Sequence, residues 1–468
     1  MVLLKYIKSK GAGELIRKIK WNNHEILGNL ELDLSKGESD TYNTIILAGE
    51  NGSGKTTILE TLSSYLNTGD IQPFEEINYD VGGKSYSIIP NGINESAKFP
   101  DATKRYILKN KTTGVIKEIG VKSTQKGAMS YDQEDIRYYG CVNSKARSGF
   151  PAGAVKSSTT SMLDDSIYES DTKDNFTDIK QLLVDISIDD SITFSEIGQA
   201  STTVSWIDFE PNSKLYRFKK AFNEFFDTMK FKRVEKNSYS VFQIVFEKNN
   251  KEIDIDSLST GEKQIVFRGA HLLKNNKKID GGIALIDEPE LSMHPKWQSK
   301  ILQYYRGLFT ISGKQKVQTF IATHSDYVLR AGLEDKDNVL IIILKDKAGK
   351  IAPTYLNNPP FVLPNITPAE TNYLAFGVAT TDYHTLLYGY LQDKTSNNTV
   401  KGCDNYITNS PNYDKKTHDK PSPDKAGKLA YQTLPTFIRN AIHHPDSSRT
   451  YSNYELETSI ELLRLLCK

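Results

Sequence analysis

Residues 49–56, Gly-Glu-Asn-Gly-Ser-Gly-Lys-Thr, fit the pattern G-x-x-x-x-G-K-[ST], whose chemistry is the binding of phosphate groups. The glycines let the backbone curl so that its N–H groups face phosphate oxygens, and a helix that follows adds the partial positive charge of its N-terminus. Lys55 would reach the β- and γ-phosphates of a nucleoside triphosphate, and the Thr56 hydroxyl would hold Mg²⁺. The expected nucleotide contacts are Gly49, Asn51, Gly52, Ser53, Gly54, Lys55, Thr56 and Thr57.

Two carboxylates and one imidazole follow apolar runs further along the chain. Residues 283–286 predict a buried parallel strand that ends in Asp287 and Glu288, and residues 319–323 predict a second strand that ends in His324. Ligands bind at the carboxyl ends of strands in open α/β sheets. Asp287 would complete the Mg²⁺ shell through water, so that Thr56 and Asp287 are the expected metal ligands. Glu288 would polarise the water that attacks the γ-phosphate.

A third candidate site lies at residues 257–264, Ser-Leu-Ser-Thr-Gly-Glu-Lys-Gln. Ser259 and Glu262 have the spacing of a capping box, which predicts that a helix starts here and runs towards Lys274. A helix N-terminus that exposes Ser and Gly can bind an anion, so Ser259, Gly261 and Glu262 are candidate nucleotide contacts. Taken alone, the same pattern also describes an ordinary, well-capped helix.

Strands and helices must position these side chains. Residues 44–48 predict a buried strand before the phosphate-binding loop, and residues 57–62 predict the start of a helix after it. Residues 144–174, rich in Ser, Thr, Gly and Asp, predict a mobile or disordered insertion. Period-two patterns predict further strands and apolar spacing predicts further helices: strands within 13–48, 70–125, 136–142 and 241–247, and helices at 182–186 and 216–229.

The bulk composition indicates a protein with a sizeable core. The 468 residues are 38% hydrophobic and 25% charged, and the net charge of +1 gives no overall basic field for nucleic acid. The three cysteines lie far apart without a C-x-x-C motif, which argues against a disulfide framework or a structural zinc site. The sequence has no run of about 18 apolar residues and no secretory signal. We therefore expect a cytoplasmic protein without a membrane span.

The four motifs are, in chain order, residues 49–56, 257–264, 283–288 and 319–324. In this order they resemble the ABC-type ATPase heads of the SMC/RecF/OLD group, over about residues 13–345. Residues 288–295, Glu-Pro-Glu-Leu-Ser-Met-His-Pro, look like the variant in ATPases of the OLD type and their anti-phage relatives. The resemblance implies an α/β fold: a head with a mixed sheet, an antiparallel β lobe and a flexible or helical insertion at about 144–235. ATP and Mg²⁺ are the cofactors that it implies.

The resemblance also implies a homodimer through ATP-bound heads, with higher assembly left open. Ser259 and Gly261 would act in trans on the γ-phosphate held by the loop of a second copy. His324 would be the switch histidine that senses that phosphate, and residues 292–294 would couple the two sites.

The sequence also departs from this group. No long heptad region or zinc hook lies between the phosphate-binding loop and Ser259, which excludes a long-armed SMC protein. A clear Q-loop glutamine is missing, and Asn143 is the substitute that we consider. Asp346 follows the strand predicted at 341–344 without a paired aspartate, which argues against the Toprim nuclease domain of OLD proteins.

We expect a domain boundary between residues 360 and 361, followed by a small all-α domain over 361–468. Residues 367–370 predict a capping box, and 368–392 predict mostly helix. The polar residues 394–427 predict a loop, residues 428–443 a helix that Pro435 breaks or kinks and Pro445 stops, and residues 452–455 the cap of a last helix that runs to Leu466.

Residues 439–444, Arg-Asn-Ala-Ile-His-His, resemble the R-[N/D/H]-x-x-x-H signature of HEPN-type ribonucleases. RNA can be cut without metal when a histidine moves the proton and a cation stabilises the charged phosphorus centre. Arg439 suits the second role and His444 the first, with transfer RNA as a candidate substrate. On a regular helix, however, Arg439 and His443 share a face, and His444 lies about 140° away.

Three functions therefore remain open. The ATPase could gate a ribonuclease formed by its own C-terminal domain in an abortive-infection or toxin–antitoxin-like defence system. It could instead bind and control a separately encoded toxin, nuclease or inhibitor. It could also be a DNA-repair ATPase of RecF type that uses exposed loops such as 104–111 to contact a phosphate backbone.

Overall fold

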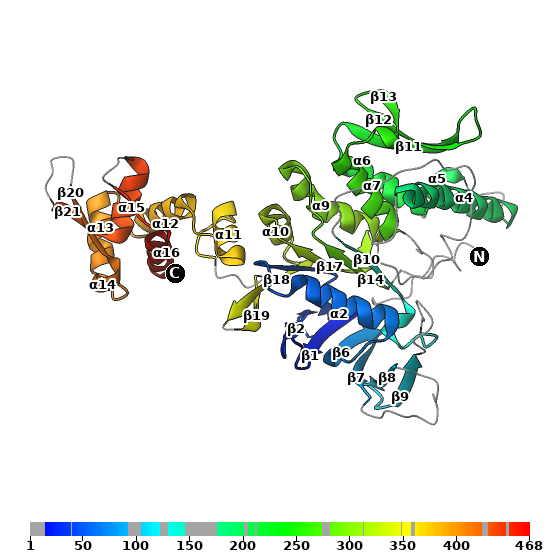
Figure 1. The fold of residues 1–468 in the computed structure, drawn as a ribbon, viewed down its shortest axis with the longest axis horizontal. Coiled ribbons are helices and arrows are strands. Elements are labelled where there is room, and N and C mark those ends of the chain that lie inside the picture. Colours follow the sequence, from blue (N-terminus) through cyan, green and yellow to red (C-terminus); the bar gives the residue numbers. More distant parts are fainter. Residues whose placement is uncertain are drawn as a thin grey trace. The chain divides into compact units, whose positions relative to one another are not determined.

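The structure is a computed structural model that falls into two compact units, Met1–Tyr355 and Leu356–Lys468 (Figure 1). The domain boundary proposed from the sequence, between 360 and 361, lies a few residues beyond this division. The structure describes residues 15–38, 40–91, 104–121, 130–145, 176–200, 205–210, 213–273, 281–311, 313–347, 349–356, 361–423, 429–445 and 449–468. Most of the insertion predicted as mobile, 146–174, lies outside these ranges.

The centre of the first unit is a six-stranded sheet. Its strands run parallel except for the edge strand β19, which pairs antiparallel with β18. The strands between the edges are almost wholly buried because their residues are apolar on both faces, as parallel strands require. In spatial order the strands are β10 (Cys141–Ser144), β14 (Ile283–Asp287), β17 (Gln318–Thr323), β5 (Thr44–Gly49), β18 (Val339–Lys347) and β19 (Lys350–Tyr355).

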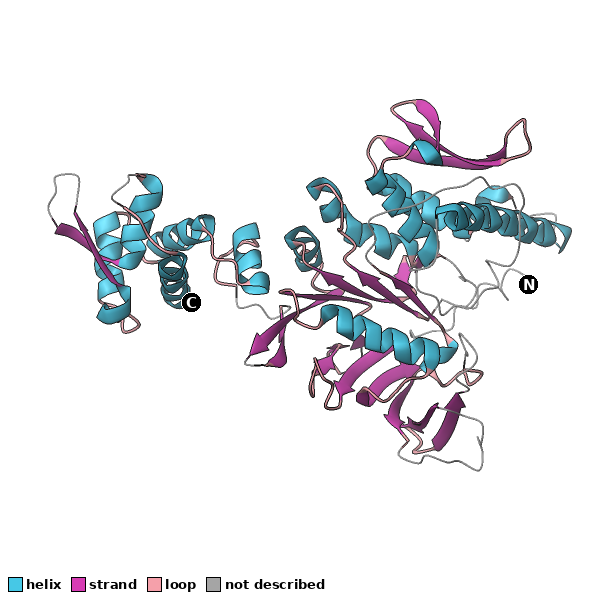
Figure 2. Ribbon diagram, in the orientation of Figure 1, coloured by secondary structure: helices cyan, strands magenta, loops and turns pink. Residues whose placement is uncertain are grey.

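A second six-stranded sheet, entirely antiparallel, forms a β lobe, and helix α2 (Lys55–Thr68) lies between the two sheets (Figure 2). One hydrophobic core joins both sheets and this helix. Within it the indole N–H of Trp21 donates to the Thr61 hydroxyl at 3.1 Å, and the Tyr65 ring meets Phe74 edge-on. The lobe strands in spatial order are β2 (Glu31–Asp33), β1 (Leu15–Trp21), β6 (Phe74–Val81), β7 (Lys84–Pro90), β8 (Lys104–Asn110) and β9 (Ile116–Val121).

Helices and a three-stranded antiparallel sheet complete the first unit. An aromatic cluster that includes Phe222, Phe226 and Trp297 packs α6 against α9 and the small sheet. These elements are α4 (Phe176–Ala200), α5 (Trp206–Phe209), α6 (Lys214–Phe225), β11 (Met229–Lys236), β12 (Phe242–Lys248), β13 (Lys251–Asp254), α7 (Thr260–Leu272), α9 (Pro295–Leu308) and α10 (Asp326–Leu333). Two short hairpins, β3 (Ser35–Lys36) with β4 (Asp40–Thr41) and β15 (Thr310–Ile311) with β16 (Lys314–Gln315), join neighbouring segments.

Two predicted elements of this unit are wrong in their bounds. The strand expected over 136–142 begins only at Cys141, because Ile136–Tyr138 forms a 3-10 turn capped by the Asp135 carboxylate. The helix expected over 216–229 ends at Phe225, and Met229 already begins β11. In both cases apolar residues that fit either periodicity were assigned to the wrong one.

The second unit is mainly helical and also carries a two-stranded hairpin that the sequence analysis did not predict. Its core is formed by residues such as Tyr383, Leu387, Ile438 and Ile460. Its elements are α11 (Pro368–Phe376), α12 (Thr381–Lys394), α13 (Val400–Thr408), α14 (Lys415–His418), β20 (Asp419–Pro423), β21 (Leu429–Thr433), α15 (Leu434–His443) and α16 (Asn453–Cys467). The capping box of Ser452 and Glu455 is confirmed.

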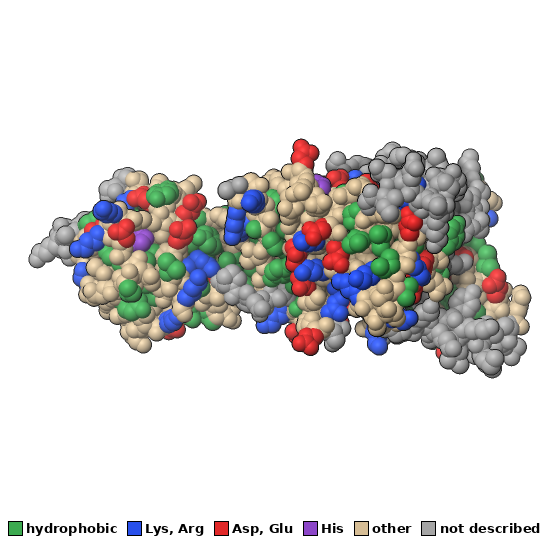
Figure 3. All heavy atoms as spheres, turned by 90° about the horizontal axis from the view of Figure 1, so that it is seen from below, with side chains coloured by type: hydrophobic (Ala, Val, Ile, Leu, Met, Phe, Trp, Pro, Cys, Tyr) green, Lys and Arg blue, Asp and Glu red, His purple; other side chains and the backbone are tan. Residues whose placement is uncertain are grey.

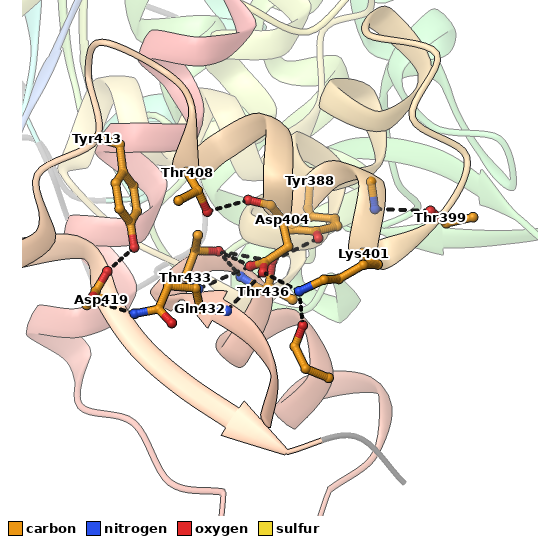
Figure 4. Close-up of polar contacts among 12 residues, drawn as sticks. Tyr388, Thr399, Lys401, Asp404, Thr408, Tyr413, Asp419, Gln432, Thr433 and Thr436 are labelled. Carbon is orange, nitrogen blue, oxygen red and sulfur yellow. Dashed lines mark hydrogen bonds and ion pairs between the residues drawn. The ribbon is translucent and has the colours of Figure 1, made fainter. Parts of the chain in front are cut away.

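The polar loop predicted over 394–427 is wrong for its greater part, and Asp404 shows why (Figure 4). This carboxylate is 1% exposed and accepts from the Gln432 N–H at 2.9 Å, the Thr433 N–H at 3.1 Å and the Thr433 hydroxyl at 2.8 Å. It thereby ties α13 to the start of α15, which Thr433 caps. Pro435 lies in the first turn of α15, where proline is favoured, so it starts this helix instead of breaking it.

Candidate nucleotide-binding site

The phosphate-binding loop joins β5 to α2, and its glycines are required by its shape. Gly49 has φ +144°, and a Cβ there would lie 2.3 Å from the Leu344 carbonyl oxygen. Gly54, the residue before α2, has φ +88°, and a Cβ would lie 2.6 Å from the Leu27 side chain. No described side chain caps α2, so its first N–H groups remain available to an anion.

Lys55 is held inside this loop. Its ammonium group donates to the carbonyl oxygens of Gly49 at 3.0 Å and Glu50 at 2.8 Å, and to the Ser53 hydroxyl at 3.3 Å. Burial lowers the pKa of Lys55, while Asp287 and Glu288 act in the opposite direction. The ammonium therefore shares one electrostatic site with the carboxylates that follow β14.

Thr56 and Asp287, which lie 231 residues apart in sequence, meet directly: the threonine hydroxyl lies 3.1 and 3.4 Å from the two carboxylate oxygens. Strand β17 separates their strands in the sheet, and all three end at the same edge. Burial raises the pKa of Asp287, and Glu288 adds to the effect. Adjacent hydroxyl and carboxylate oxygens in a desolvated, negatively charged place fit Mg²⁺, which prefers hard oxygen ligands.

Glu288 and His324 also lie together, with 3.6 Å between His324 Nε2 and Glu288 Oε1. Both side chains are about one-third exposed, at 33% and 34%. Burial, and then the Lys55 charge, lower the pKa of His324 against the opposing effect of Glu288, which favours the neutral ring. Glu288 has φ +43°, a left-handed conformation that costs a non-glycine residue energy and often marks a functional position.

The third motif forms the start of α7. Ser259 is the N-cap, and its N–H donates to the Glu262 carboxylate at 2.8 Å, so the predicted capping box is confirmed. Glu262 also pairs with Lys248 at 2.8 Å, which means that this carboxylate holds the helix start together. Gly261 lies against a neighbouring ring and loop: a Cβ there would be 3.1 Å from Trp297 and 3.5 Å from the Ser292 carbonyl oxygen.

Sequence reasoning missed Arg268, which links this helix to the sheet edge that carries the candidate metal ligand Asp287. It lies on α7, is 1% exposed, and donates from Nη1 to the main-chain carbonyl oxygen of Asp287 at 2.9 Å. Its charge opposes the rise in the pKa of Asp287. An arginine within the buried run of residues 264–272 is an unusual pattern that could have signalled this role.

Asn143 and Asp346, which the sequence analysis also considered, both make contacts that explain them as structural residues. Asn143 donates to Ser63 at 3.1 Å, and Ser63 lies on α2 about 10 Å beyond Thr56, so this contact does not support the Q-loop role. Asp346 accepts from the Gly349 N–H at 2.7 Å and shapes the turn between β18 and β19.

In the second unit, Arg439, His443 and His444 lie at the end of α15. Arg439 donates to the Asn440 side chain at 3.0 Å, and His444 leaves the helix with φ −135°. Burial lowers the pKa of His443, and the nearby Arg439 and His444 lower it further, so both residues lie within electrostatic reach of His443. His443 and His444 are exposed, whereas His384 is buried against Ser459 at 2.9 Å and belongs to the core.

Several basic residues of the β lobe are paired with carboxylates of the same lobe or its neighbouring segment. Residues 104–110 form strand β8 and are not the exposed loop that the sequence suggested. Lys18, Lys20 and Lys117 are paired with carboxylates, and Lys111 lies 3.4 Å from Glu76. On the face in Figure 3, which includes this lobe, basic and acidic side chains are interspersed.

The fold and the site together have the arrangement expected of a P-loop ATPase head: a phosphate-binding motif between a parallel strand and a helix, with Asp287, Glu288 and His324 at the same sheet edge. Residues 164–330 match the family model described as "AAA domain, putative AbiEii toxin, Type IV TA system". That range contains these three residues and Ser259, and the phosphate-binding loop precedes it. Within the described residues, no helix is long and apolar enough to cross a membrane.

The chain is 24% identical over 343 residues to the Septu protein PtuA of Bacillus thuringiensis, which covers 68% of this chain and 73% of that protein. It is 23% identical over 378 residues to the Retron Vc95 probable ATPase of Vibrio cholerae serotype O1 biovar El Tor, covering 67% and 71%. Among solved structures, an SmcHead bound to the C-winged helix domain of ScpA matches 74% of this chain and 99% of its own, at 15% identity and a TM-score of 0.37. The SMC head domain from Thermotoga maritima matches at 13% identity over 73% and 98%, with a TM-score of 0.35.

Proposed function

We propose that this protein is an ATP-hydrolysing switch of an anti-phage defence system, and that it works as a homodimer of ATPase heads. The observation that carries the ATPase assignment is the contact of Thr56 with Asp287 beside the pair of Glu288 and His324. The names of the relatives, a Septu protein and a retron ATPase, support the defence setting.

Each residue then has a defined task. The loop N–H groups and Lys55 bind the phosphates, and Thr56 and Asp287 would hold Mg²⁺, which supplies charge neutralisation on the phosphate oxygens. Glu288 accepts the proton of the attacking water. The neutral His324 donates a hydrogen bond to the γ-phosphate or to that water, and its position 3.6 Å from Glu288 suits both.

In the proposed dimer, the start of α7 contacts the nucleotide that is bound to the other copy. Ser259 and Thr260 are exposed, and the Ser259 N–H is used within its own capping box. A helix N-terminus with an exposed Ser259 and a bare Gly261 backbone is suited to a phosphate that another copy presents. Contact of Gly261 with the Ser292 loop joins this surface to the segment that follows Glu288.

Replacing Ser259 by arginine should separate binding from turnover. We expect the S259R variant to bind ATP as tightly as the wild type, to lose ATP-dependent dimerisation, and to hydrolyse ATP at least about 100-fold more slowly, because the γ-phosphate loses its donors in trans. Light scattering with ATP and steady-state hydrolysis measure the two effects. Ser257→Arg, two residues earlier and also exposed, is the control. Normal turnover by a monomeric S259R protein would exclude the proposed dimer.

A second candidate activity is metal-independent cleavage of RNA by the second unit. The exposed His443, which lies within electrostatic reach of Arg439, and the adjacent exposed His444 favour it, because a proton-transfer group beside a cation is what this chemistry requires. The competing function is control of a separately encoded toxin or nuclease, with the second unit as its docking surface.

Expression of the full chain during phage challenge separates these two functions. If the second unit is a ribonuclease, Arg439→Ala or His444→Ala should reduce RNA fragmentation by about 100-fold or more, while the exposed Lys416→Ala leaves it unchanged. Sequencing of RNA ends and growth curves give the readout. Intact RNA from the wild type, with protection that requires a neighbouring gene, would favour the separately encoded effector.

A further inference from the structure

Glu290 is a carboxylate to which none of the motifs assigns a task. It lies in the turn after β14, and its Oε1 accepts two hydrogen bonds at 2.7 Å, one from the Thr323 hydroxyl and one from the main-chain N–H of His324. Its Oε2 is buried and has no hydrogen-bond partner within the described part of the chain. The side chain therefore spans the gap between the end of β14 and the end of β17.

This contact fixes the backbone at the point where the sheet stops. Strand β17 ends at Thr323, so the His324 N–H lies beyond the strand ladder, and the Glu290 carboxylate satisfies it. A hydrogen bond to a charged acceptor is roughly twice as strong as a neutral one. Because Glu290 follows Glu288 in the same turn, the bond sets the place of His324 relative to Glu288.

A second set of hydrogen bonds holds Ser325, the residue that follows His324. The Ser325 hydroxyl donates to the Gln298 side-chain oxygen at 2.6 Å, and the Gln298 amide donates to the Met293 carbonyl oxygen at 3.0 Å. Thr323 is thus bonded directly to the chain segment that follows β14, and Ser325 is connected to it through Gln298 of α9. That segment includes Glu288 and Ser292, which both adopt left-handed backbone conformations, at φ +43° and +61°.

Glu290 itself is poorly placed to act as the general base. Its Oε1 is already occupied by two donors, and its Oε2 is enclosed by protein. Glu288, by contrast, is 34% exposed and faces the imidazole. Glu290 therefore acts through His324 and not on the attacking water.

We propose that Glu290 is a positioning residue for ATP hydrolysis, which holds His324 at its distance from Glu288 through the His324 N–H and the Thr323 hydroxyl. This inference rests on the proposed ATPase function. It explains why the turn after Glu288 carries a second carboxylate, and it joins the segment that leads to the proposed coupling residues 292–294 to His324, the residue proposed to contact the γ-phosphate.

The test compares three variants of this turn: a conservative and a truncating change of Glu290, and a conservative change of Glu288. Glu290→Gln keeps an oxygen that can accept both bonds, so we expect kcat within about threefold of the wild type. Glu290→Ala removes the acceptor, and we expect kcat to fall about 10- to 100-fold with KM for ATP changed by less than about twofold, because a displaced catalytic group costs turnover before binding. Glu288→Gln, the same chemical change two residues earlier, should abolish most turnover.

A double-mutant cycle with His324→Ala tests whether Glu290 affects turnover through His324. Glu290→Ala should cause no further loss in kcat once His324 is absent, because its effect passes through that ring. Multiplicative losses, or a rise in KM that accounts for the whole effect, would overturn the proposal. Equal kcat in E290A and the wild type would overturn it as well.

A readout without catalysis keeps this inference separate from the ATPase proposal. In protein labelled at histidine ¹³Cε1, the His324 signal is identified by its loss in H324A. We expect E290A to move this signal towards that of an exposed histidine and E290Q to leave it in place. An unmoved signal in E290A refutes the positioning role, whereas absent ATP turnover in the wild type refutes only the proposed function.

Discussion

ATP turnover should fall about 100- to 10,000-fold when Glu288 is replaced by glutamine, with ATP still bound. The amide keeps the size and the hydrogen-bonding oxygen of the carboxylate but cannot accept a proton from water. Lys55, Thr56 and Asp287 are unchanged in this variant, so phosphate and metal binding should persist. Because hydrolysis is what would separate the heads, E288Q should also accumulate as an ATP-bound dimer. Single-turnover hydrolysis with radiolabelled ATP and size-exclusion chromatography with and without ATP measure the two effects.

The matched control is Glu334→Gln, an exposed glutamate just beyond α10 whose loss should leave kcat unchanged. Hydrolysis at the wild-type rate by E288Q would show that another group takes the proton, and Glu290 would be the first residue to re-examine. Weak ATP binding by E288Q would instead place Glu288 in the metal site. Loss of turnover with ATP still bound is the expected result, since the left-handed backbone of Glu288, at φ +43°, is strain of a kind that persists at positions that a mechanism needs.

The motifs predicted which residues meet at the candidate nucleotide site, because these residues follow local rules. The form G-x-x-x-x-G-K-[ST] between a predicted strand and a predicted helix can be recognised from local sequence alone, and the meeting of the strand ends at Asp287 and His324 follows from parallel strands sharing one edge. The meeting of Thr56 with Asp287 is a consequence of that topology. How residues 288–294 fold was not predictable, because the left-handed Glu288 and Ser292 depend on tertiary contacts.

Arg268 and Glu290 show the limit of sequence reasoning within the site. Each acts on a main-chain atom of a residue distant in sequence, the Asp287 carbonyl and the His324 N–H. Such bonds leave no spacing pattern, because the partner is any backbone group that the fold brings near. For Arg268, its place as a charged residue inside an apolar run is the one sign of a buried role, and that sign does not reveal the partner.

The second unit shows a different limit. The polar composition of residues 394–427 favoured a loop, yet buried bonds from Asp404 and a hairpin organise much of it. The capping box predicted at residues 367–370 is also only half formed, again because a polar side chain is used inside the core. Thr367 caps α11 as expected, but Glu370 turns inward and accepts from the N–H groups of Val362 at 2.7 Å and Leu363 at 3.2 Å. Its carboxylate is 0% exposed and serves the core.

That buried carboxylate leads to the largest expected effect on stability. Arg464 of α16 lies 3.1 Å from Glu370 and also donates to the Tyr383 hydroxyl, which in turn donates to Glu370 at 3.0 Å. The trio joins α11, α12 and α16. Replacing Arg464 by alanine leaves a buried carboxylate without its cation, so we expect the second unit to lose about 3–5 kcal/mol of unfolding free energy. Hydrogen exchange of the full chain in increasing urea, read on peptides from 361–468, measures the loss.

The control distinguishes a missing charge partner from a missing side chain. In the double variant Arg464→Met with Glu370→Gln, the core keeps its volume and loses both charges, and most of the lost free energy should return, because a neutral amide is far cheaper to bury than an unpaired carboxylate. Peptides from the first unit report within the same experiment whether the change is local. If R464A loses less than about 1 kcal/mol, the three bonds that Glu370 accepts from Val362, Leu363 and Tyr383 suffice to hold the carboxylate, and the cation would then matter for function more than for folding.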